Sequence, residues 1–190
     1  MTKYILHGGL TRIKNKFNFL FFKEILKNLK EPVKILLVLF ARKEKDWPLR
    51  QKREIKHFRQ SNPNKNVEFT IANKNTVTLI RQIKNSDVVY LLGGSPSLLK
   101  KEMGKVKNLK KLFNKKVVVG SSAGAYILSK YYFSKSEGGI GKGLNILPIK
   151  TIAHYDKKFK KELQNLKDYK EKLKTYAIAE TKYIVIHSSD

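Results

Sequence analysis

Short apolar segments alternate along the chain with longer segments whose apolar residues recur at helical spacing. Alternation of this kind is typical of a mostly parallel sheet with helices packed on both of its faces. We therefore predict an α/β fold, arranged as a three-layer sandwich around a mostly parallel central sheet. The predicted strands are residues 3–6, 33–40, 67–72, 87–92, 116–119, 149–153 and 183–186.

The segments between these strands carry helix signals. Asp46 and Pro48 are typical of a helix start, and Ser95-Pro96 combines an N-cap residue with a proline in the first turn. The glycine-rich segment 136–143 is predicted to be a loop. The predicted helices are residues 17–29, 46–60 and 76–83, a helix directly after Pro96, residues 123–130, and a lysine-rich helix marked by Phe159, Leu163, Leu166 and Leu173.

Composition excludes several classes of protein. The 190 residues contain no cysteine, so a disulfide framework, a thiolate metal site and a cysteine nucleophile are excluded. The longest apolar run, 35–41, is far shorter than the roughly 20 residues of a membrane helix, and the N-terminus does not resemble a signal peptide. We expect one domain spanning residues 1–190 in a soluble cytoplasmic protein without a membrane partner.

The net charge of +26 has two interpretations. It fits a partner that is a polyanion, bound in a salt-dependent way. It also fits an AT-rich coding sequence, since lysine greatly outnumbers arginine and the basic residues are spread along the chain. Interleaved stacking aromatics, a zinc pattern and a helix-turn-helix are all missing from the sequence, so a nucleic-acid partner is the less favoured interpretation.

Glycines stand where three predicted strands end: Gly8-Gly9, Gly93-Gly94 and the segment 120–124. Ligands of parallel sheets bind at these carboxyl ends. The segment 120–124 reads Gly-Ser-Ser-Ala-Gly between a strand and a helix, which fits a nucleophile elbow with Ser122 as the exposed hydroxyl. Ser121 is expected to point elsewhere. A tight turn without chemistry, or a phosphate-binding turn, remains the alternative, although the P-loop pattern is absent.

A serine nucleophile needs a base and a group that orients the base. Of the four histidines, His154 follows a predicted strand and is the preferred base, with a structural role as its alternative. Glu137 and Asp156 are the nearby acids. Glu137 lies in a loop that can fold back, whereas Asp156 is too close along the chain to reach the far ring nitrogen. A solvated loop carboxylate is the competing interpretation of Glu137.

Three segments, "VVVGSSAGAYIL", "DVVYLLGGSPSLL" and "LPIKTIAHYD", resemble peptidase family S51, the group of dipeptidase E and cyanophycinase. The resemblance extends over roughly residues 3–187 and implies a class I glutamine-amidotransferase-like, flavodoxin-like fold. It also implies Ser122 as nucleophile, His154 as base, Glu137 as acid, and an oxyanion hole formed by the amides of Gly94 and Ala123.

The sequence departs from the family pattern at three places. Ser95 stands where family members usually carry asparagine, which makes it a candidate substrate contact. The acid at position 137 is glutamate instead of aspartate. Relatives usually continue with further strands beyond the equivalent of Asp190, so the C-terminal part is expected to be shortened.

The resemblance predicts a serine-type dipeptidase that cleaves small peptides, prefers an N-terminal acidic residue, and requires no cofactor and no metal. A homodimer is left open. The alternatives are an inactive or other-substrate member of the same fold, and, from a different class, a polyanion-binding protein.

Overall fold

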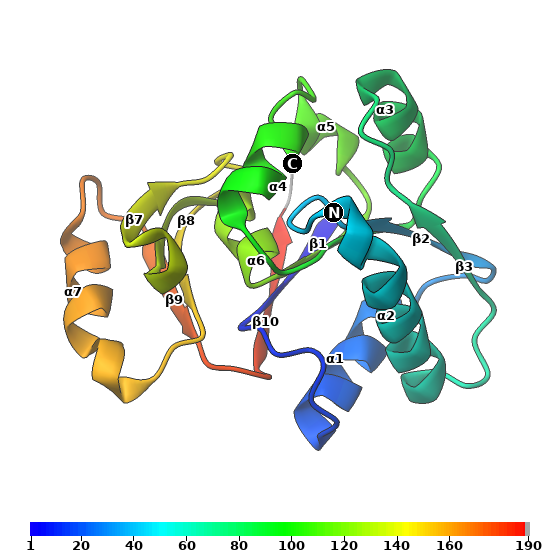
Figure 1. Ribbon diagram of the computed structural model, residues 1–190, viewed down its shortest axis with the longest axis horizontal. Helices are drawn as coiled ribbons and strands as arrows, with labels where there is room; N and C mark the ends of the chain where they lie inside the picture. The colour runs from blue at the N-terminus through cyan, green and yellow to red at the C-terminus, as the bar shows by residue number, and fades with distance from the viewer. Residues whose placement is uncertain (189–190) are drawn as a thin grey trace.

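A computed structural model describes residues 1–188 and contains a six-stranded sheet in the order β10-β1-β5-β4-β2-β3 (Figure 1). Five strands are parallel to their neighbours, and only β10 pairs antiparallel, with β1. The strands are β1 (Thr2–His7), β2 (Val33–Val38), β3 (Val67–Ile71), β4 (Val88–Leu91), β5 (Val117–Ser121) and β10 (Tyr183–Ser188).

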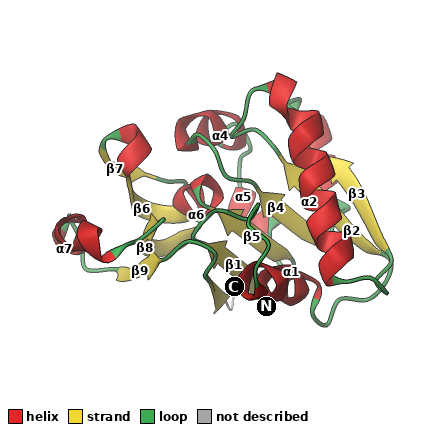
Figure 2. Ribbon diagram, turned by 60° about the horizontal axis from the view of Figure 1, so that its bottom comes forward, coloured by secondary structure: helices red, strands yellow, loops and turns green. Residues whose placement is uncertain are grey.

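Helices cover both faces of this sheet (Figure 2). Side chains of a strand alternate between the faces, so Tyr4 and Leu6 pack in one apolar cluster and Ile5 in the other. This arrangement confirms the predicted α/β fold. One face holds α1 (Lys16–Leu26) and α2 (Trp47–Ser61), and the other holds α3 (Thr76–Lys84), α4 (Pro96–Met103), α5 (Leu109–Leu112) and α6 (Ala123–Leu128).

A second sheet, in the order β7-β6-β8-β9, lies beside the first and was only partly predicted. Its one predicted strand is β8; β7 was assigned to a loop, the first two residues of β6 were assigned to a helix, and β9 was not assigned. The helix α7 (Lys160–Asp168) packs on this sheet. The strands are β6 (Ser129–Ser134), β7 (Gly139–Lys142), β8 (Leu147–Ala153) and β9 (Lys174–Ile178).

Two of these three errors have a local reason. The helix predicted to reach residue 130 ends at Leu128, because the Ser129 hydroxyl bonds the Ala125 carbonyl oxygen and Thr151 of β8. The predicted loop 136–143 contains a 3-10 turn and the strand β7, whose Gly141 leaves room for the Tyr132 ring. The lysine-rich helix ends at Asp168 instead of 173, and β9 follows it.

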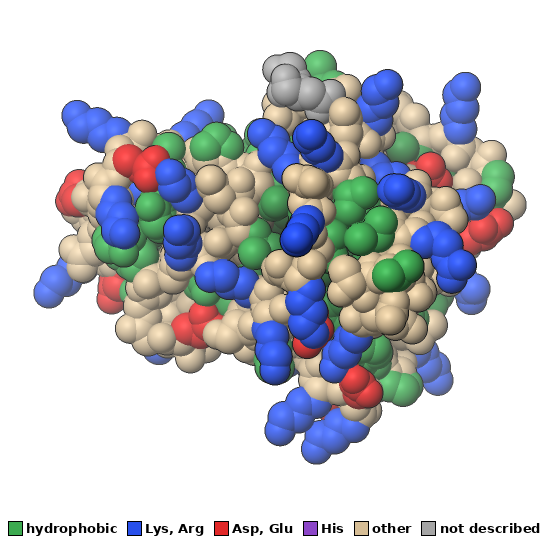
Figure 3. Space-filling model, turned by 90° about the horizontal axis from the view of Figure 1, so that it is seen from above, with side chains coloured by type: hydrophobic (Ala, Val, Ile, Leu, Met, Phe, Trp, Pro, Cys, Tyr) green, Lys and Arg blue, Asp and Glu red, His purple; other side chains and the backbone are tan. Residues whose placement is uncertain are grey.

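Basic side chains are dispersed over the face seen from above, with few acidic side chains among them (Figure 3). The view from above shows lysine and arginine distributed across the whole face. Within residues 1–188, none of the helices combines the length and apolar character needed to cross a membrane.

The carboxyl ends of β1 and β8 meet, and this joins the two sheets. The His154 amide, directly after β8, donates to the Gly8 carbonyl oxygen at 2.9 Å, and the Thr181 amide donates to that of Gly9 at 3.0 Å. Gly9 has a φ of 103°, and a methyl group there would overlap the His154 imidazole. Glycine is therefore required at this position for His154 to approach β1.

A buried histidine lies beneath this junction. The His7 side chain has no exposed surface, and its Nδ1 accepts a hydrogen bond from the Gly9 amide at 3.0 Å. The hydrogen must then be on Nε2, which donates to Asn18 Oδ1 at 2.9 Å. Burial is the main reason that the pKa of His7 falls from 6.5 to about 4; the hydrogen bond to Asn18 opposes the fall and the positive charge of His154 adds to it.

We expect the free energy of unfolding to decrease as the pH falls from 6.5 to about 4. In this window the unfolded chain binds a proton at His7 that the folded chain does not, so stability rises with pH. At the acidic end of this window, the free energy of unfolding that is lost because of His7 reaches about 3 kcal/mol. Denaturant unfolding of wild type and His7→Gln between pH 4 and 8 measures it: the two stability curves should run parallel above pH 7 and converge below 6.5. Curves that stay parallel throughout would contradict the prediction.

Candidate active site

Ser122 lies in a strained turn between β5 and α6. Its φ and ψ are 51° and −106°, a conformation that side-chain-bearing residues rarely adopt. The Ser122 amide donates to the His7 carbonyl oxygen at 2.9 Å, and the Ser122 carbonyl oxygen accepts from the Tyr126 amide at 3.0 Å. A methyl group on Gly120 would lie 2.6 Å from the Gly124 carbonyl carbon, so the turn closes only with small residues. This is the geometry of a nucleophile elbow.

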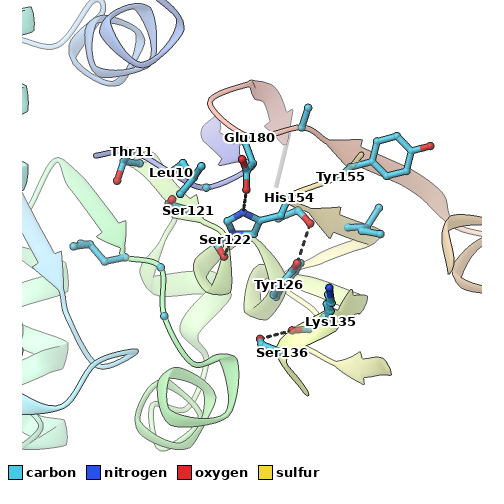
Figure 4. Close-up of a pocket in the computed structure, with 18 of the residues that line it drawn as sticks. Leu10, Thr11, Ser121, Ser122, Tyr126, Lys135, Ser136, His154, Tyr155 and Glu180 are labelled. Atoms are coloured by element: carbon cyan, nitrogen blue, oxygen red, sulfur yellow. Dashed lines mark hydrogen bonds and ion pairs between the residues drawn. The ribbon is translucent and has the colours of Figure 1, made fainter. Parts of the chain in front are cut away.

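A chain of hydrogen bonds joins Ser122 to an imidazole and a carboxylate (Figure 4). Ser122 Oγ is 2.9 Å from His154 Nε2, and His154 Nδ1 is 2.9 Å from Glu180 Oε1. Because an ionised carboxylate only accepts hydrogen bonds, Nδ1 carries the ring hydrogen. The lone pair of Nε2 then faces the serine hydroxyl, which is the arrangement of a serine nucleophile with its base and orienting acid.

Glu137 does not occupy the acid position, and this corrects the sequence prediction. Its carboxylate accepts hydrogen bonds from the Ser97 amide at 2.9 Å, from the Ser97 hydroxyl, and from the Tyr132 hydroxyl at 2.7 Å. Burial alone would raise the pKa of Glu137, but these hydrogen bonds hold it below its usual range. Glu137 therefore attaches the turn before β7 to the start of α4.

Sequence reasoning missed Glu180 because it did not predict β9. Strand β9 pairs in parallel with β8, Ala153 opposite Ile178, so the residues after both strands emerge at the same edge. His154 and Glu180 are 26 residues apart in sequence and become neighbours through this pairing. The signal was an apolar strand-like segment, "TYAIA", followed directly by an acid. The other candidate, Asp156, lines the pocket and accepts a hydrogen bond from the Lys158 amide at 3.1 Å.

Ser95 is a helix cap, and its predicted contact with substrate is not supported. Its hydroxyl accepts a hydrogen bond from the Leu98 amide at 3.3 Å at the start of α4. Ser95 is absent from the residues that line the cavity around Ser122. His57 is mostly buried and stacks on Phe22, with ring centroids 5.3 Å apart.

The predicted oxyanion residues lie beside Ser122. A methyl group on Gly93 would be 3.3 Å from Ser122 Cβ, so the Gly93-Gly94 segment passes directly over the serine. The Gly93 carbonyl oxygen accepts a hydrogen bond from Arg42 Nε at 2.9 Å. In a planar trans peptide the N–H points opposite to the C=O, so the Gly94 amide points away from Arg42. Ala123 is the first residue of α6, where an amide has no acceptor within the helix.

A cavity of about 920 Å³ opens over Ser122. Its walls come from both sheets, from the loops after β1 and β2, and from α2. Six basic side chains and three acidic ones line it, so the cavity carries a surplus of positive charge. The charged residues are Arg12, Arg42, Arg50, Arg53, Lys135 and Lys158, with Glu54, Asp156 and Glu180.

Comparison with known proteins bears out the fold. The chain is similar to the crystal structure of a peptidase from an acI-B1 Actinobacterium, with a TM-score of 0.69, 19% identity, and coverage of 98% of this chain and 83% of that one. It is also similar to a putative peptidase E protein from Listeria monocytogenes EGD-e, with a TM-score of 0.66, 18% identity, and coverage of 100% and 96%. No curated protein matches the sequence.

The sequence model of peptidase family S51 matches residues 5–190, almost the whole chain. The two structural neighbours share the fold at low sequence identity, and both are described as peptidases. The chain therefore belongs to peptidase family S51 and is a serine peptidase.

Proposed function

We propose that the protein is an exopeptidase that hydrolyses small peptides through Ser122, His154 and Glu180. The observation that carries this proposal is the unbroken hydrogen-bond chain from Ser122 Oγ through His154 to Glu180, at 2.9 Å for each contact. Ser122, His154 and Glu180 all line the cavity, so a substrate carbonyl group has access to the serine hydroxyl.

In the proposed reaction, Ser122 Oγ attacks the carbonyl carbon of the scissile bond while His154 Nε2 takes the hydroxyl proton. The tetrahedral intermediate collapses when the imidazolium returns this proton to the leaving amine, which departs as the C–N bond breaks. A water molecule then attacks the acyl-enzyme and gives its proton to His154. The imidazolium returns this proton to Ser122 Oγ as the acyl C–O bond breaks, and the carboxylic acid product leaves. Glu180 holds the imidazole in the required tautomer and stabilises its positive charge.

The amides of Gly94 and Ala123 are the proposed oxyanion donors. Charge develops on the carbonyl oxygen as Ser122 attacks, and donors held rigidly in advance stabilise it without reorganisation. The hydrogen bond from Arg42 to the Gly93 carbonyl oxygen, 2.9 Å long, supports this role because it holds the peptide group that contains the Gly94 amide.

A preference for acidic substrates is the second part of the proposal. The positive surplus in the cavity attracts a carboxylate more strongly than a neutral side chain. Lys135 and Lys158 stand on the side formed by the second sheet, and four arginines stand on the opposite side.

We expect Ser122→Ala to lose peptide hydrolysis by at least about 1,000-fold in kcat, because the nucleophile is removed while the binding cavity is retained. Release of free amino acids from a library of aspartyl dipeptides measures the effect. Circular dichroism of the variant provides the folding control. Hydrolysis at the wild-type rate would exclude Ser122 as nucleophile.

Two glutamate variants separate the acid from the residue that the sequence suggested. Glu180→Gln should lower kcat by about 100-fold or more, since glutamine stabilises the imidazolium poorly and permits the wrong tautomer. Glu137→Gln should change kcat by less than about tenfold, because Glu137 contacts Ser97 and Tyr132 instead of His154. Steady-state kinetics on one dipeptide compares the two. The reverse order of effects would return the acid role to Glu137.

The charge preference is tested with an isosteric pair. Asp-Leu should be cleaved with a kcat/KM at least about tenfold above that of Asn-Leu, because the two differ only in the charge that the cavity attracts. Raising the salt concentration should lower the ratio of the two kcat/KM values, because salt screens the charge of the cavity. An equal kcat/KM for both peptides at low salt would remove the acidic preference and leave the hydrolase assignment intact.

A further inference from the structure

Four arginines gather on one wall of the cavity. Arg12 follows the turn after β1, Arg42 follows β2, and Arg50 and Arg53 stand three residues apart on α2, on one face of the helix. These guanidinium groups are close enough to affect one another: burial is the main reason that the pKa of Arg42 is lowered, and the charges of Arg50, Arg53 and Arg12 lower it further.

One of the four arginines has a carboxylate partner. Arg53 forms an ion pair with Glu54 at 2.9 Å. Glu54 is completely buried, and the hydroxyl groups of Tyr90 and Thr11 also donate to its carboxylate, at 3.3 and 3.4 Å. This network neutralises Arg53 and fixes the position of α2 against the sheet.

The other three keep their positive charge without a carboxylate in contact. Arg42 donates to the Gly93 carbonyl oxygen, which is neutral, and Asp46 offsets its charge only at a distance. Among residues 1–188, Arg12 and Arg50 have no ion pair. Arg50 Nε is moreover buried without a hydrogen-bond partner. Burying an unmatched donor of a charged group is unfavourable, and an incoming acceptor would offset this cost.

The charge count indicates what kind of group fits. A single carboxylate would neutralise one guanidinium and leave the other two repelling each other. A group with two negative charges and several oxygens can accept from all three, and guanidinium forks match phosphate and carboxylate oxygens well.

We infer that Arg12, Arg42 and Arg50 form a subsite for a dianionic group of the substrate, either a phosphate monoester or two neighbouring carboxylates. The inference deepens the proposed function and rests on this cavity being the substrate site. Arg42 also bonds the Gly93 carbonyl oxygen, and Gly93 lies against Ser122, so the dianion is held close to the scissile bond.

Binding is tested without hydrolysis, on the Ser122→Ala protein. Calorimetric titration with inorganic phosphate, malonate and acetate is carried out at pH 8 and constant ionic strength, where phosphate and malonate are mainly dianions and acetate is a monoanion. We expect phosphate or malonate to bind at least about tenfold more tightly than acetate. A stronger affinity for phosphate than for malonate identifies the phosphoryl group as the natural ligand. A stronger affinity for malonate than for phosphate identifies a pair of carboxylates.

Matched variants locate the subsite. Arg50→Gln and Arg12→Gln should each weaken binding of the preferred dianion by about tenfold. Arg59→Gln is the control, because Arg59 is exposed on the same helix, does not line the cavity, and its replacement removes the same charge. It should change the affinity by less than about twofold.

Two results would overturn the subsite. The first is acetate binding as tightly as the dianions. The second is Arg59→Gln weakening dianion binding as much as Arg50→Gln does, because this would show that the attraction comes from a diffuse surface charge. Either result leaves the peptidase proposal standing if Ser122-dependent hydrolysis is present. Conversely, dianion binding that depends on Arg50 in a protein that hydrolyses no peptide would retain the subsite and reject the proposed function.

Discussion

The contact between the ends of β1 and β8 is the constraint on which the rest of the site depends. The contact places the end of β8, in the small second sheet, against the end of β1 in the large sheet. It is made through the hydrogen bond from the His154 amide to the Gly8 carbonyl oxygen. The imidazole then lies over Gly9, where a side chain would exclude it. Without this contact, the end of β8 that carries His154 would not be held within reach of Ser122.

The same junction holds both members of the serine–histidine pair in unusual backbone conformations. Ser122 and His154 have φ values of 51° and 54°, each of which costs of the order of 1–3 kcal/mol for a residue with a side chain. Hydrogen bonds to the carbonyl oxygens of His7 and Gly8 keep these conformations in place. His7 thus contributes from below the site: its backbone binds Ser122, and its buried neutral ring binds the turn that faces His154. The strain is therefore balanced by the core of the fold and is present before any substrate binds.

Charge has two distinct distributions in this molecule. Lysine accounts for most of the excess of +26. Basic side chains are dispersed over the face shown in Figure 3, where water and salt screen their charge. The arginines of the cavity are different, because Arg42, Arg50 and Arg53 are partly buried and three of the four arginines lack a carboxylate in contact. Net charge therefore says little about the ligand, whereas the local balance in the cavity indicates an anionic group.

Much of the fold could be predicted from local patterns. Most strands of the large sheet are apolar segments, and three of them, β1, β4 and β5, end at glycines. The turn around Ser122 has a sequence in which only small residues fit. The start of strand β6 was assigned to the helix before it, and β7 was assigned to a loop. Their strand conformation comes from pairing with distant partners such as Thr151 and from the Tyr132 ring packed over Gly141.

The sequence by itself determined the α/β architecture, the serine turn and the strand end that carries His154, because each depends on residues that are close together in the chain. Only the tertiary structure decided the acid. Glu137 had the expected spacing from Ser122, but its carboxylate is occupied by Ser97 and Tyr132. Glu180 reaches His154 because β9 pairs in parallel with β8, and a pairing between segments far apart in sequence leaves no mark in the spacing of either one.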